Sequence, residues 1–564
     1  MKFSELSYSR PDINALSKQF SLLLTEFNNT ENAEEHIKII DSINKIRNTF
    51  ETFSSIASVK YTQDTTNTFN QEEQNYFDQN GPVFTGLVVD LYNTILKSKH
   101  KPTLEKHFGK QLFSIAQMSV DTFKKEVLED LQKENRLASE YTKLLSSAKI
   151  EFKGNQYNLS EIATFIDSSD REERKQAQEA KYKYFVKNAS EFDRLFDELV
   201  KLRTSIAQKL GYKNFTELGY KRMLRGDYNA AMVAEYREQV RKHIVPLTTK
   251  LKDRQLKRLG LDKLKYYDEA LGFKSGNANP KGNPEWIVDN ATKMYEELSP
   301  ETGEFIHFMV DNEMMDLVSR KGKAPGGYCT FFSEYKSPFI FSNFNGTSHD
   351  IIVLTHEAGH AFQGYSSRNF NVPEYYFPTY EACEIHSMSM EFITWPWMDL
   401  FFLEDTDKFK FSHVSKALSF LPYGVAVDEF QHWVYENYKA TPKERNNAWR
   451  EIEKKYIPFR DYDGNSFLEQ GGFWQQQAHI YKSPFYYIDY TLAQICAFQF
   501  WKKATEDRKK TMENYIRLCK AGGSKSFLEL VDLANLISPF KSGCLETVAK
   551  DVNGWLETID DRKL

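Results

Sequence analysis

The segment from His356 to His360 reads His-Glu-Ala-Gly-His, which is the HExxH pattern. Side chains four residues apart lie above one another on one face of an α-helix, so His356 and His360 could hold one metal ion. Glu357 is one step round the helix, where its carboxylate could take a proton from a water that the metal activates. Apolar residues flank the pattern, and buried imidazoles are costly without partners. We therefore predict a metal site here rather than a chance HExxH on a surface helix.

A third ligand must come from elsewhere in the chain, because a catalytic zinc usually takes three protein ligands and leaves one position for water. The metzincin pattern would place Gly at 363 and His at 366, and Gln363 and Ser366 exclude it. The next segment, residues 379–392, has no Pro or Gly and is predicted to be a helix. A carboxylate on this helix is the remaining usual ligand.

Several glutamates could supply that carboxylate. Glu384 and Glu391 are seven residues apart on one helix face, so one could bind the metal while the other accepts the second ring N–H of a histidine ligand. Glu381 shares roughly the same face, and Glu374 lies just before the helix in a loop that contains proline. Periodicity alone leaves the choice among the four open.

A second group of polar residues lies far downstream on a Pro-containing turn: His479, Tyr486, Tyr487 and Tyr490. Hydrolysis of an amide places negative charge on the carbonyl oxygen, and each donor aimed at that oxygen could lower the barrier by about 3 kcal/mol. Because the chain has 31 tyrosines, aromatic packing is the alternative. The preceding residues 469–474 read either as a loop that closes over substrate or as a surface turn.

The one stretch with strand character runs from Gly326 to Asn345, directly before HExxH. Aromatic and β-branched residues bounded by Gly, Pro and Asn favour a hairpin or a small sheet. An exposed sheet edge there could pair with the backbone of an extended peptide. We expect Ser342, Asn343 and Phe344 to make that contact.

These motifs resemble those of a known family. His-Glu-Ala-Gly-His, followed by Glu384 24 residues after His360 and by Glu391 seven further on, is similar to the thimet-oligopeptidase-like zinc peptidases. Within them, Glu-Ala-Cys-Glu-Ile-His-Ser-Met-Ser-Met-Glu and Phe-Ser-Asn-Phe-Asn-Gly resemble the bacterial oligoendopeptidase F branch, which includes the PZ-peptidases. The resemblance covers the chain from residue 156 to its end.

The resemblance implies one Zn²⁺ ion per chain, with His356, His360 and Glu384 as its ligands. Glu357 would be the general base, and Glu391 would hold a histidine ligand by its second ring N–H.

For the downstream group, the resemblance implies that His479 and the tyrosines after it contact the transition state. Tyr487 and Tyr490 keep the three-residue separation of the family. The distance from His479 is slightly shorter than in the thimet branch, which leaves the choice between Tyr486 and Tyr487 open.

The elements that position these residues read mostly as helix. Apolar stripes at spacings of three and four, from Ile13 to Phe27 and from Ile39 to Phe53, predict packed helices. A Gly-, Asn- and Pro-rich break at 272–280 predicts a surface loop. We expect a mainly α fold with two helical lobes flanking a deep channel, as in the family, and a small β-sheet next to the HExxH helix. Residues 1–155 would form an N-terminal helical region and 156–564 the catalytic region.

The composition bounds the class of protein. The chain has 564 residues, more than one compact core usually supports, and 41% of them are apolar. Its net charge of −5 gives no sign of a basic surface for nucleic acid or anionic lipid. No stretch approaches the roughly 20 apolar residues that span a bilayer, and the first residues lack the features of a secretion signal. Five cysteines, an odd number, favour free thiols in a reducing cytoplasm.

We therefore expect a cytoplasmic, zinc-dependent endopeptidase that hydrolyses internal bonds of short oligopeptides with a metal-activated water. Neither nucleic acid nor membrane is expected as a partner. The alternatives are a zinc exopeptidase on a similar scaffold, a catalytically silent peptide-binding protein, and a helical interaction scaffold without metal. The intact His-Glu-His set argues against the silent binder, because a binder has no need of Glu357.

Overall fold

The computed structural model describes all residues, 1–564, and is mainly helical, which confirms the predicted fold class. Its N-terminal part consists of α1 (Ile13–Asn29), α2 (Ala33–Gln63), α3 (Thr68–Lys97), α4 (Lys101–Phe108), α5 (Lys110–Asp121) and α6 (Leu128–Ser146). Asp12, Asn32 and Asn67 begin the first three helices by accepting hydrogen bonds from backbone N–H groups of the first turn. Phe20 and Ile43, from the two predicted apolar stripes, are fully buried in a core that α1 to α5 share.

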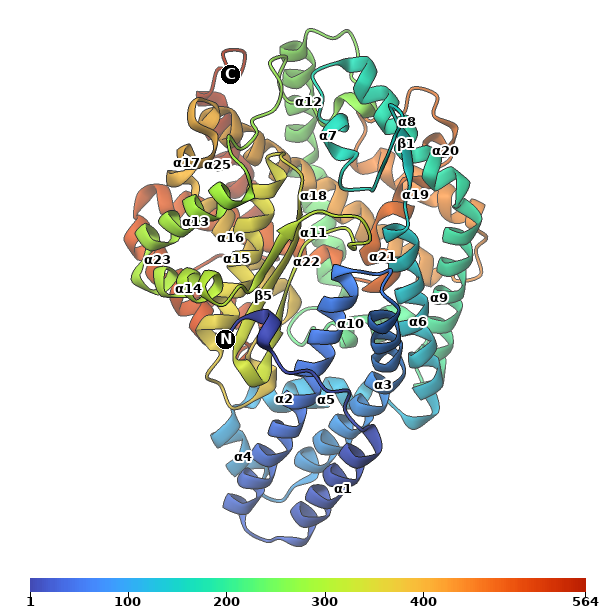
Figure 1. Cartoon of the computed structure of the whole chain (residues 1–564), viewed down its shortest axis with the longest axis vertical. Coiled ribbons are helices and arrows are strands. Elements are labelled where there is room, and N and C mark those ends of the chain that lie inside the picture. Colours follow the sequence, from blue (N-terminus) through green and yellow to red (C-terminus); the bar gives the residue numbers. More distant parts are fainter.

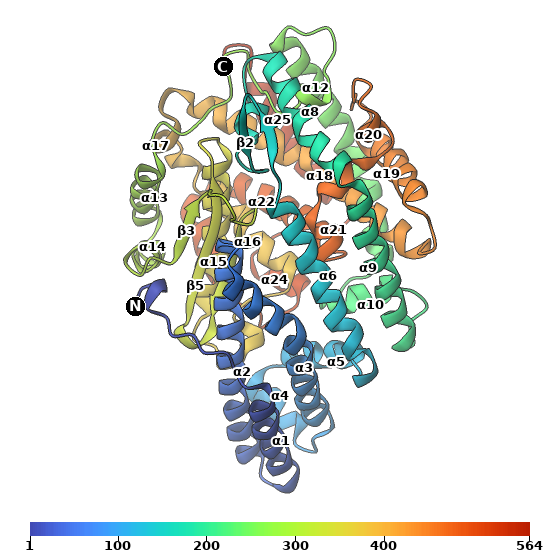
Figure 2. The ribbon, with the colours of Figure 1, turned by 45° about the vertical axis from the view of Figure 1, so that its right-hand side comes forward.

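The middle of the chain begins with a small antiparallel hairpin of β1 (Ile150–Phe152) and β2 (Asn155–Tyr157). The helices that follow are α7 (Ala163–Ile166), α8 (Arg171–Lys187), α9 (Ala189–Lys209), α10 (Phe215–Arg222), α11 (Ala230–His243), α12 (Val245–Leu259), α13 (Pro284–Leu298) and α14 (Pro300–Asp311). The predicted break at 272–280 is a loop between α12 and α13. Figures 1 and 2 both show α8 and α9 on the opposite side of the molecule from α13 and α14.

The predicted strand region forms a three-stranded sheet of β3 (Met315–Val318), β4 (Tyr328–Phe332) and β5 (Ser337–Phe344). The strand order is β3-β5-β4, with β5 parallel to β3 and antiparallel to β4. Lys336, at φ 49°, completes the tight connection between β4 and β5. In this order β5 is the central strand and is almost wholly buried, and β4 lies at one edge of the sheet.

The HExxH segment lies on α15 (His349–Ser367), directly after the sheet, as predicted. Backbone N–H groups of Asn345 and Gly346 donate to the carboxylate of Asp350 over 3.0 and 2.8 Å, which ties the connecting loop to the first turn of α15. The next helix is α16 (Tyr380–Ile393). A Cβ on Gly359 would lie 2.6 Å from Cα of Ser387, so only glycine lets α15 and α16 approach this closely.

The rest of the chain is helical and packs around α15 and α16. It comprises α17 (Asp399–Phe402), α18 (Thr406–Glu436), α19 (Pro442–Tyr456), α20 (Ser466–Glu469), α21 (Ala478–Lys482), α22 (Tyr487–Glu506), α23 (Arg508–Ala521), α24 (Phe527–Leu533) and α25 (Cys544–Thr558). None of the helices combines the length and the apolar content that crossing a bilayer requires. The division of the chain at residues 155 and 156 stays a prediction.

Candidate metal centre and active site

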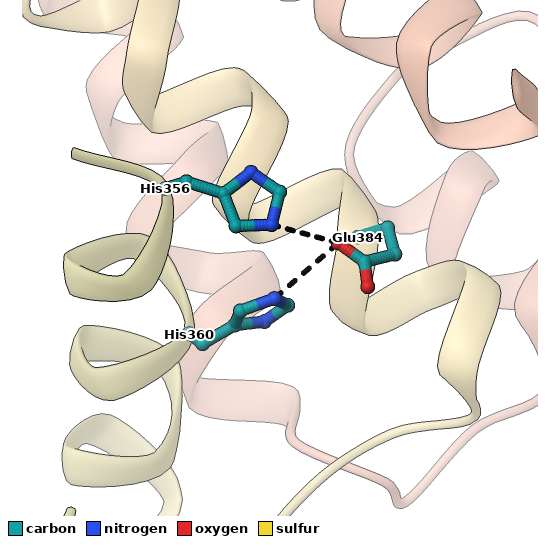
Figure 3. Close-up of side chains that lie close together, drawn as sticks. All are labelled: His356, His360 and Glu384. Carbon is teal, nitrogen blue, oxygen red and sulfur yellow. Dashed lines mark ion pairs between the residues drawn. The ribbon is translucent and has the colours of Figure 1, made fainter. Parts of the chain in front are cut away.

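Two imidazoles and one carboxylate converge where α15 meets α16 (Figure 3). Nε2 of His356 lies 3.2 Å and Nε2 of His360 lies 3.3 Å from Oε2 of Glu384. The three ligand atoms all lie within 4.8 Å of one another. Ligands at zinc–ligand distances of about 2.05 Å in a tetrahedron lie roughly 3.3 Å apart, so the donor set and its spacing both fit zinc.

Electrostatics hold Glu384 in its ionised form. Burial opposes ionisation of this carboxyl, but the two imidazoles beside it hold its pKa well below the usual range. Its second oxygen, Oε1, accepts a hydrogen bond from the hydroxyl of Tyr486 over 2.5 Å. Tyr486 therefore fixes the carboxylate with Oε2 turned toward the histidines.

A chain of hydrogen bonds fixes the tautomer of His356. The Nε1–H of Trp395 donates to Nδ1 of His413 over 2.9 Å, so His413 carries its proton on Nε2. That proton goes to Glu391, 2.7 Å away, and the other oxygen of Glu391 lies 2.7 Å from Nδ1 of His356. Because Nδ1–H of His356 donates to Glu391, Nε2, which faces Glu384, is the ring nitrogen left to bind a metal ion.

The two remaining glutamates that the sequence left open lie outside the group of converging ligand atoms. The carboxylate of Glu374 pairs with the guanidinium of Arg47 at 2.7 Å and accepts a hydrogen bond from Tyr92. Glu381 is buried, and burial together with the nearby carboxylate of Asp489 raises its pKa well above the usual range. Neither belongs to the group that could hold a metal ion.

Glu357 lies beside the three converging side chains rather than among them. It is 6% exposed, and its Oε2 has no hydrogen-bond partner. Burial raises the pKa of this carboxyl, although the two imidazoles oppose the shift. A Cβ on Gly327 would lie 3.4 Å from Oε1 of Glu357, so the carboxylate reaches the start of β4. A buried carboxylate with a free oxygen at this position can accept a proton.

The downstream group forms a second chain of hydrogen bonds, which ends at Tyr490. The hydroxyl of Tyr423 donates to Oε1 of Gln477 over 2.8 Å, which orients the amide. Nε2 of Gln477 then donates to Nδ1 of His479 over 2.8 Å, so His479 carries its proton on Nε2. That nitrogen lies 3.0 Å from the hydroxyl oxygen of Tyr490. Burial lowers the pKa of His479 to about 4, which keeps the ring neutral.

The four downstream residues differ in whether they line the cavity beside the metal-binding residues. Tyr486 and Tyr490 line the same cavity as His356, His360 and Glu357. His479 does not line it, and both of its ring nitrogens are engaged in the chain of hydrogen bonds. Tyr487 packs against Phe420 and Tyr423 and does not line the cavity either. With His479 donating to its oxygen, Tyr490 keeps its own O–H free to donate into the cavity.

The expected substrate-pairing residues need a correction. Ser342, Asn343 and Phe344 lie on β5, which is the central strand, and none of them lines the cavity. Residues 327–331, comprising most of β4 and the glycine before it, do line it. Alternating or continuous apolar patterns predict a strand but do not tell a central strand from an edge strand.

The cavity itself has a volume of about 1190 Å³. Residues of β4, α15, α16 and α22 line one part of it, and residues of the N-terminal helices α2 and α3 line another part. Residues 469–474 do not contribute to it: Trp474 is fully buried and its ring N–H donates to Asn446. The structure therefore gives no support to the prediction that this segment is a loop that closes over substrate.

Four residues of the site had no signal in the sequence: Trp395, His413, Tyr423 and Gln477. They come from four separate segments and act on the predicted residues only through tertiary contacts. The spacing of His413 from Glu391, 22 residues, matches no helical or strand period across the intervening turn.

Two parts of the chain match models of a known family. Residues 3–123 match the peptidase M3 N-terminal domain, and residues 290–550 match peptidase family M3. An oligoendopeptidase F homolog of Borreliella burgdorferi is 25% identical over 73% of this chain and 72% of its own length. Group B oligopeptidase PepB of Streptococcus agalactiae is 24% identical over 77% of this chain and 73% of its own.

Solved structures match over the whole chain. The structure of PZ peptidase A with an inhibitor is 57% identical, superposes with a TM-score of 0.99 and covers 100% of both chains. The structure of a proposed oligoendopeptidase F from Bacillus anthracis is 55% identical, with a TM-score of 0.95, and covers 100% of this chain and 99% of that one.

Proposed function

This chain belongs to peptidase family M3, in its oligoendopeptidase F and PZ-peptidase branch, and on that premise we propose which residues carry out its reaction. It is a metalloendopeptidase that hydrolyses oligopeptides. We assign one zinc ion per chain to His356, His360 and Glu384. The observation that carries this assignment is the convergence of their three ligand atoms, with Oε2 of Glu384 3.2 and 3.3 Å from the two imidazole nitrogens, as a tetrahedral zinc site requires.

A zinc ion there would supply Lewis acidity, which makes water easier to deprotonate and polarises the scissile carbonyl. The free Oε2 of Glu357 takes a proton from the attacking water. The oxygen of that water bonds to the carbonyl carbon, and the carbonyl oxygen becomes an oxyanion. Glu357 then returns the proton to the amide nitrogen as the C–N bond breaks, which releases a carboxylic acid and an amine.

Tyr490 is the donor that we assign to the oxyanion. Its hydroxyl lines the cavity and is polarised by His479, which donates to its oxygen over 3.0 Å. A donor that is already oriented stabilises the developing charge without reorganisation. Tyr486 lines the same wall, but its hydroxyl donates to Glu384, so we assign it to holding the ligand. His479 acts through Tyr490, and Tyr487 has no assigned part.

We place the substrate backbone along the edge of β4 that has no strand partner. β4 has β5 as its only strand partner, and its residues line the cavity beside Glu357. An extended peptide can add there as a further strand. We place it antiparallel to β4, which is the commoner and more stable pairing.

We propose that the substrates are oligopeptides and that the protein is located in the cytoplasm. A cavity of about 1190 Å³ walled on two sides accommodates an extended oligopeptide rather than a folded protein. A cytoplasmic location agrees with five cysteines that all remain free thiols.

A direct test is digestion of a mixed peptide library with and without a chelator, with products identified by mass spectrometry. We expect cleavage of internal bonds that stops on chelation and returns with zinc. The exopeptidase alternative predicts instead that peptides blocked at both ends stay intact. The scaffold alternative predicts no cleavage and no bound zinc by elemental analysis.

A further inference from the structure

Helix α2 turns one polar stripe toward the cavity. The stripe consists of residues spaced by three and four, which share one helix face: Arg47, Phe50, Glu51, Ser54, Ser55 and Ser58. All of them line the same cavity as the metal-binding residues. Two of these residues, Arg47 and Glu51, are charged, and only Arg47 is paired with another side chain.

Arg47 is paired within the protein. Its guanidinium lies 2.7 Å from Glu374 and 3.0 Å from the side-chain oxygen of Asn44, and it is 5% exposed. The charges of Arg47 and Glu374 therefore neutralise each other. Glu51, one turn further along α2, makes no hydrogen bond or ion pair with any other side chain, and it is partly exposed in the cavity.

An unpaired carboxylate in this place is unusual. The cavity wall also includes the stacked rings of Phe50, next to Glu51 in the sequence, and Phe84, whose centroids lie 3.9 Å apart. Burial raises the pKa of Glu51 to about 7, although Arg47 opposes the shift. A carboxylate that the fold leaves without a partner in a low-dielectric wall favours a cationic guest.

The position of Glu51 along the substrate groove follows from contacts between α2 and the sheet. The hydroxyl of Thr52 accepts from the backbone N–H of Glu334, just past the end of β4, whereas Thr62 contacts the hydroxyl of Tyr328 at its start. Glu357 reaches the start of β4 at Gly327. Glu51 and Glu357 therefore lie at opposite ends of β4, some five residues of extended chain apart at roughly 3.3 Å each.

We propose that Glu51 binds a cationic group of the substrate, three to six residues before the cleaved bond, and so selects peptides with a protonated amine or guanidinium there. The direction rests on the proposed function, in which the peptide runs antiparallel to β4. An antiparallel peptide passes the end of β4 first and reaches Glu357 afterwards. The cation is a Lys or Arg side chain or the free N-terminal ammonium of a short peptide.

Other charges on the cavity wall do not substitute for Glu51. Asp78 accepts hydrogen bonds from Ser139 over 2.7 Å and from Gln74 over 2.8 Å, so its oxygens are occupied. Arg222 pairs with Glu134 at 2.9 Å. Glu51 is thus the carboxylate of the N-terminal wall that remains available to a ligand.

The test uses a set of quenched fluorescent peptides that share one cleavage site and are blocked at both ends. In each, a single position before the cleaved bond carries Lys, the neutral norleucine or Glu. A second set has a free N-terminus, no charged side chains and increasing length. kcat/KM is measured for the wild-type enzyme, for Glu51→Gln and for Glu51→Lys. Glu34→Gln removes the same charge from an exposed position of α2 outside the cavity and serves as the matched control.

For the wild type we expect kcat/KM to be about tenfold higher for Lys than for norleucine at one or two adjacent positions, as for a charge-assisted hydrogen bond. Glu51→Gln should abolish this ratio, Glu51→Lys should favour Glu at the same positions, and Glu34→Gln should match the wild type. A preference in the free-terminus set at one length would identify the ammonium as the ligand. Equal ratios in the wild type and Glu51→Gln, with every peptide cleaved, would overturn the assignment, as would a preference confined to positions after the cleaved bond. Cleavage of no peptide by any variant would instead refute the proposed function.

Discussion

Nε2 of His413 lies 2.7 Å from Oε2 of Glu391, and this contact links a buried tryptophan to the metal-binding face of α15. Because each donor along the chain has one acceptor, the proton positions are determined from Trp395 through to His356. The fold therefore keeps a proton on Nδ1 of His356 and leaves Nε2 as the nitrogen that can bind a metal ion.

The first prediction concerns this chain of hydrogen bonds. His413→Ala leaves one oxygen of Glu391 without a donor, so we expect zinc affinity to fall by about 10- to 100-fold. Competition with a chromophoric chelator measures the zinc Kd. His413→Gln keeps an N–H donor and should recover part of the affinity. An unchanged Kd in a folded His413→Ala protein would contradict the role of this residue.

Glu357→Gln separates proton transfer from metal binding. The amide keeps the shape of the side chain but cannot take a proton, so we expect kcat to fall by about 10²- to 10⁴-fold. Zinc content by elemental analysis should stay at one ion per chain, because Glu357 is not among the converging ligand atoms. Near-normal turnover in this variant would refute its assignment as the base.

Tyr490 and Tyr487 form a natural pair for testing the oxyanion donor. Tyr490→Phe removes the hydroxyl that faces the cavity, and we expect a drop in kcat of about 10²- to 10³-fold with little change in KM. Tyr487→Phe removes a hydroxyl that does not line the cavity and should leave kcat unchanged. Steady-state kinetics on one quenched peptide would measure both. The reverse order of effects would transfer the role to Tyr487.

Gly359→Ala tests whether close packing of α15 on α16 builds the metal site. Helix propensity alone predicts a gain in stability of about 1 kcal/mol. The new Cβ would lie 2.7 Å from the carbonyl oxygen of His386, so we expect a net loss of roughly 1–3 kcal/mol and a weaker zinc Kd. Thermal unfolding and zinc titration give the two values. A higher Tm with unchanged zinc binding would show that the helices tolerate the methyl group.

Glu51 should also affect stability with a defined dependence on pH. Its pKa in the folded protein is about 7, against 4.5 as the ordinary value, so the folded state disfavours the ionised form. The side chain therefore lowers stability increasingly as pH rises from about 4.5 to 7, and the loss is complete above 7. We expect Glu51→Gln to unfold at higher urea than the wild type at pH 8 and at nearly the same urea at pH 5. A gain at pH 5 equal to that at pH 8 would contradict the shifted pKa.

The same titration governs substrate selection. Between pH 6 and pH 8 Glu51 gains its negative charge in the empty cavity, so the preference for Lys over norleucine should grow with pH. Arg47 and Glu374, the charged groups beside it, form an ion pair with each other. The ratio of kcat/KM for the two peptides cancels effects that act on both substrates alike. A ratio that falls across this range would contradict the inference.

Local spacing was enough to predict the helix that carries His356 and His360 and the need for a carboxylate from the next helix. It did not distinguish Glu384 from Glu374, because the ion pair that occupies Glu374 comes from Arg47, more than 300 residues away in the chain.

The residues of α2 that line the cavity also show that local sequence patterns do not reveal tertiary contacts. The apolar stripe that includes Ile43 and Phe50 correctly predicts a packed helix, but no pattern in the sequence marks Glu51 on the neighbouring face as part of a cavity. Likewise, β5 was identified as a strand, but its central place in the sheet depends on β3, a short strand with no distinctive pattern.

Anomalous X-ray scattering at the zinc absorption edge, from crystals grown with zinc, tests the central assignment most directly. We predict one strong peak about 2.0–2.2 Å from Nε2 of His356, Nε2 of His360 and a carboxylate oxygen of Glu384. A peak elsewhere in the molecule, or none between these three side chains, would contradict it.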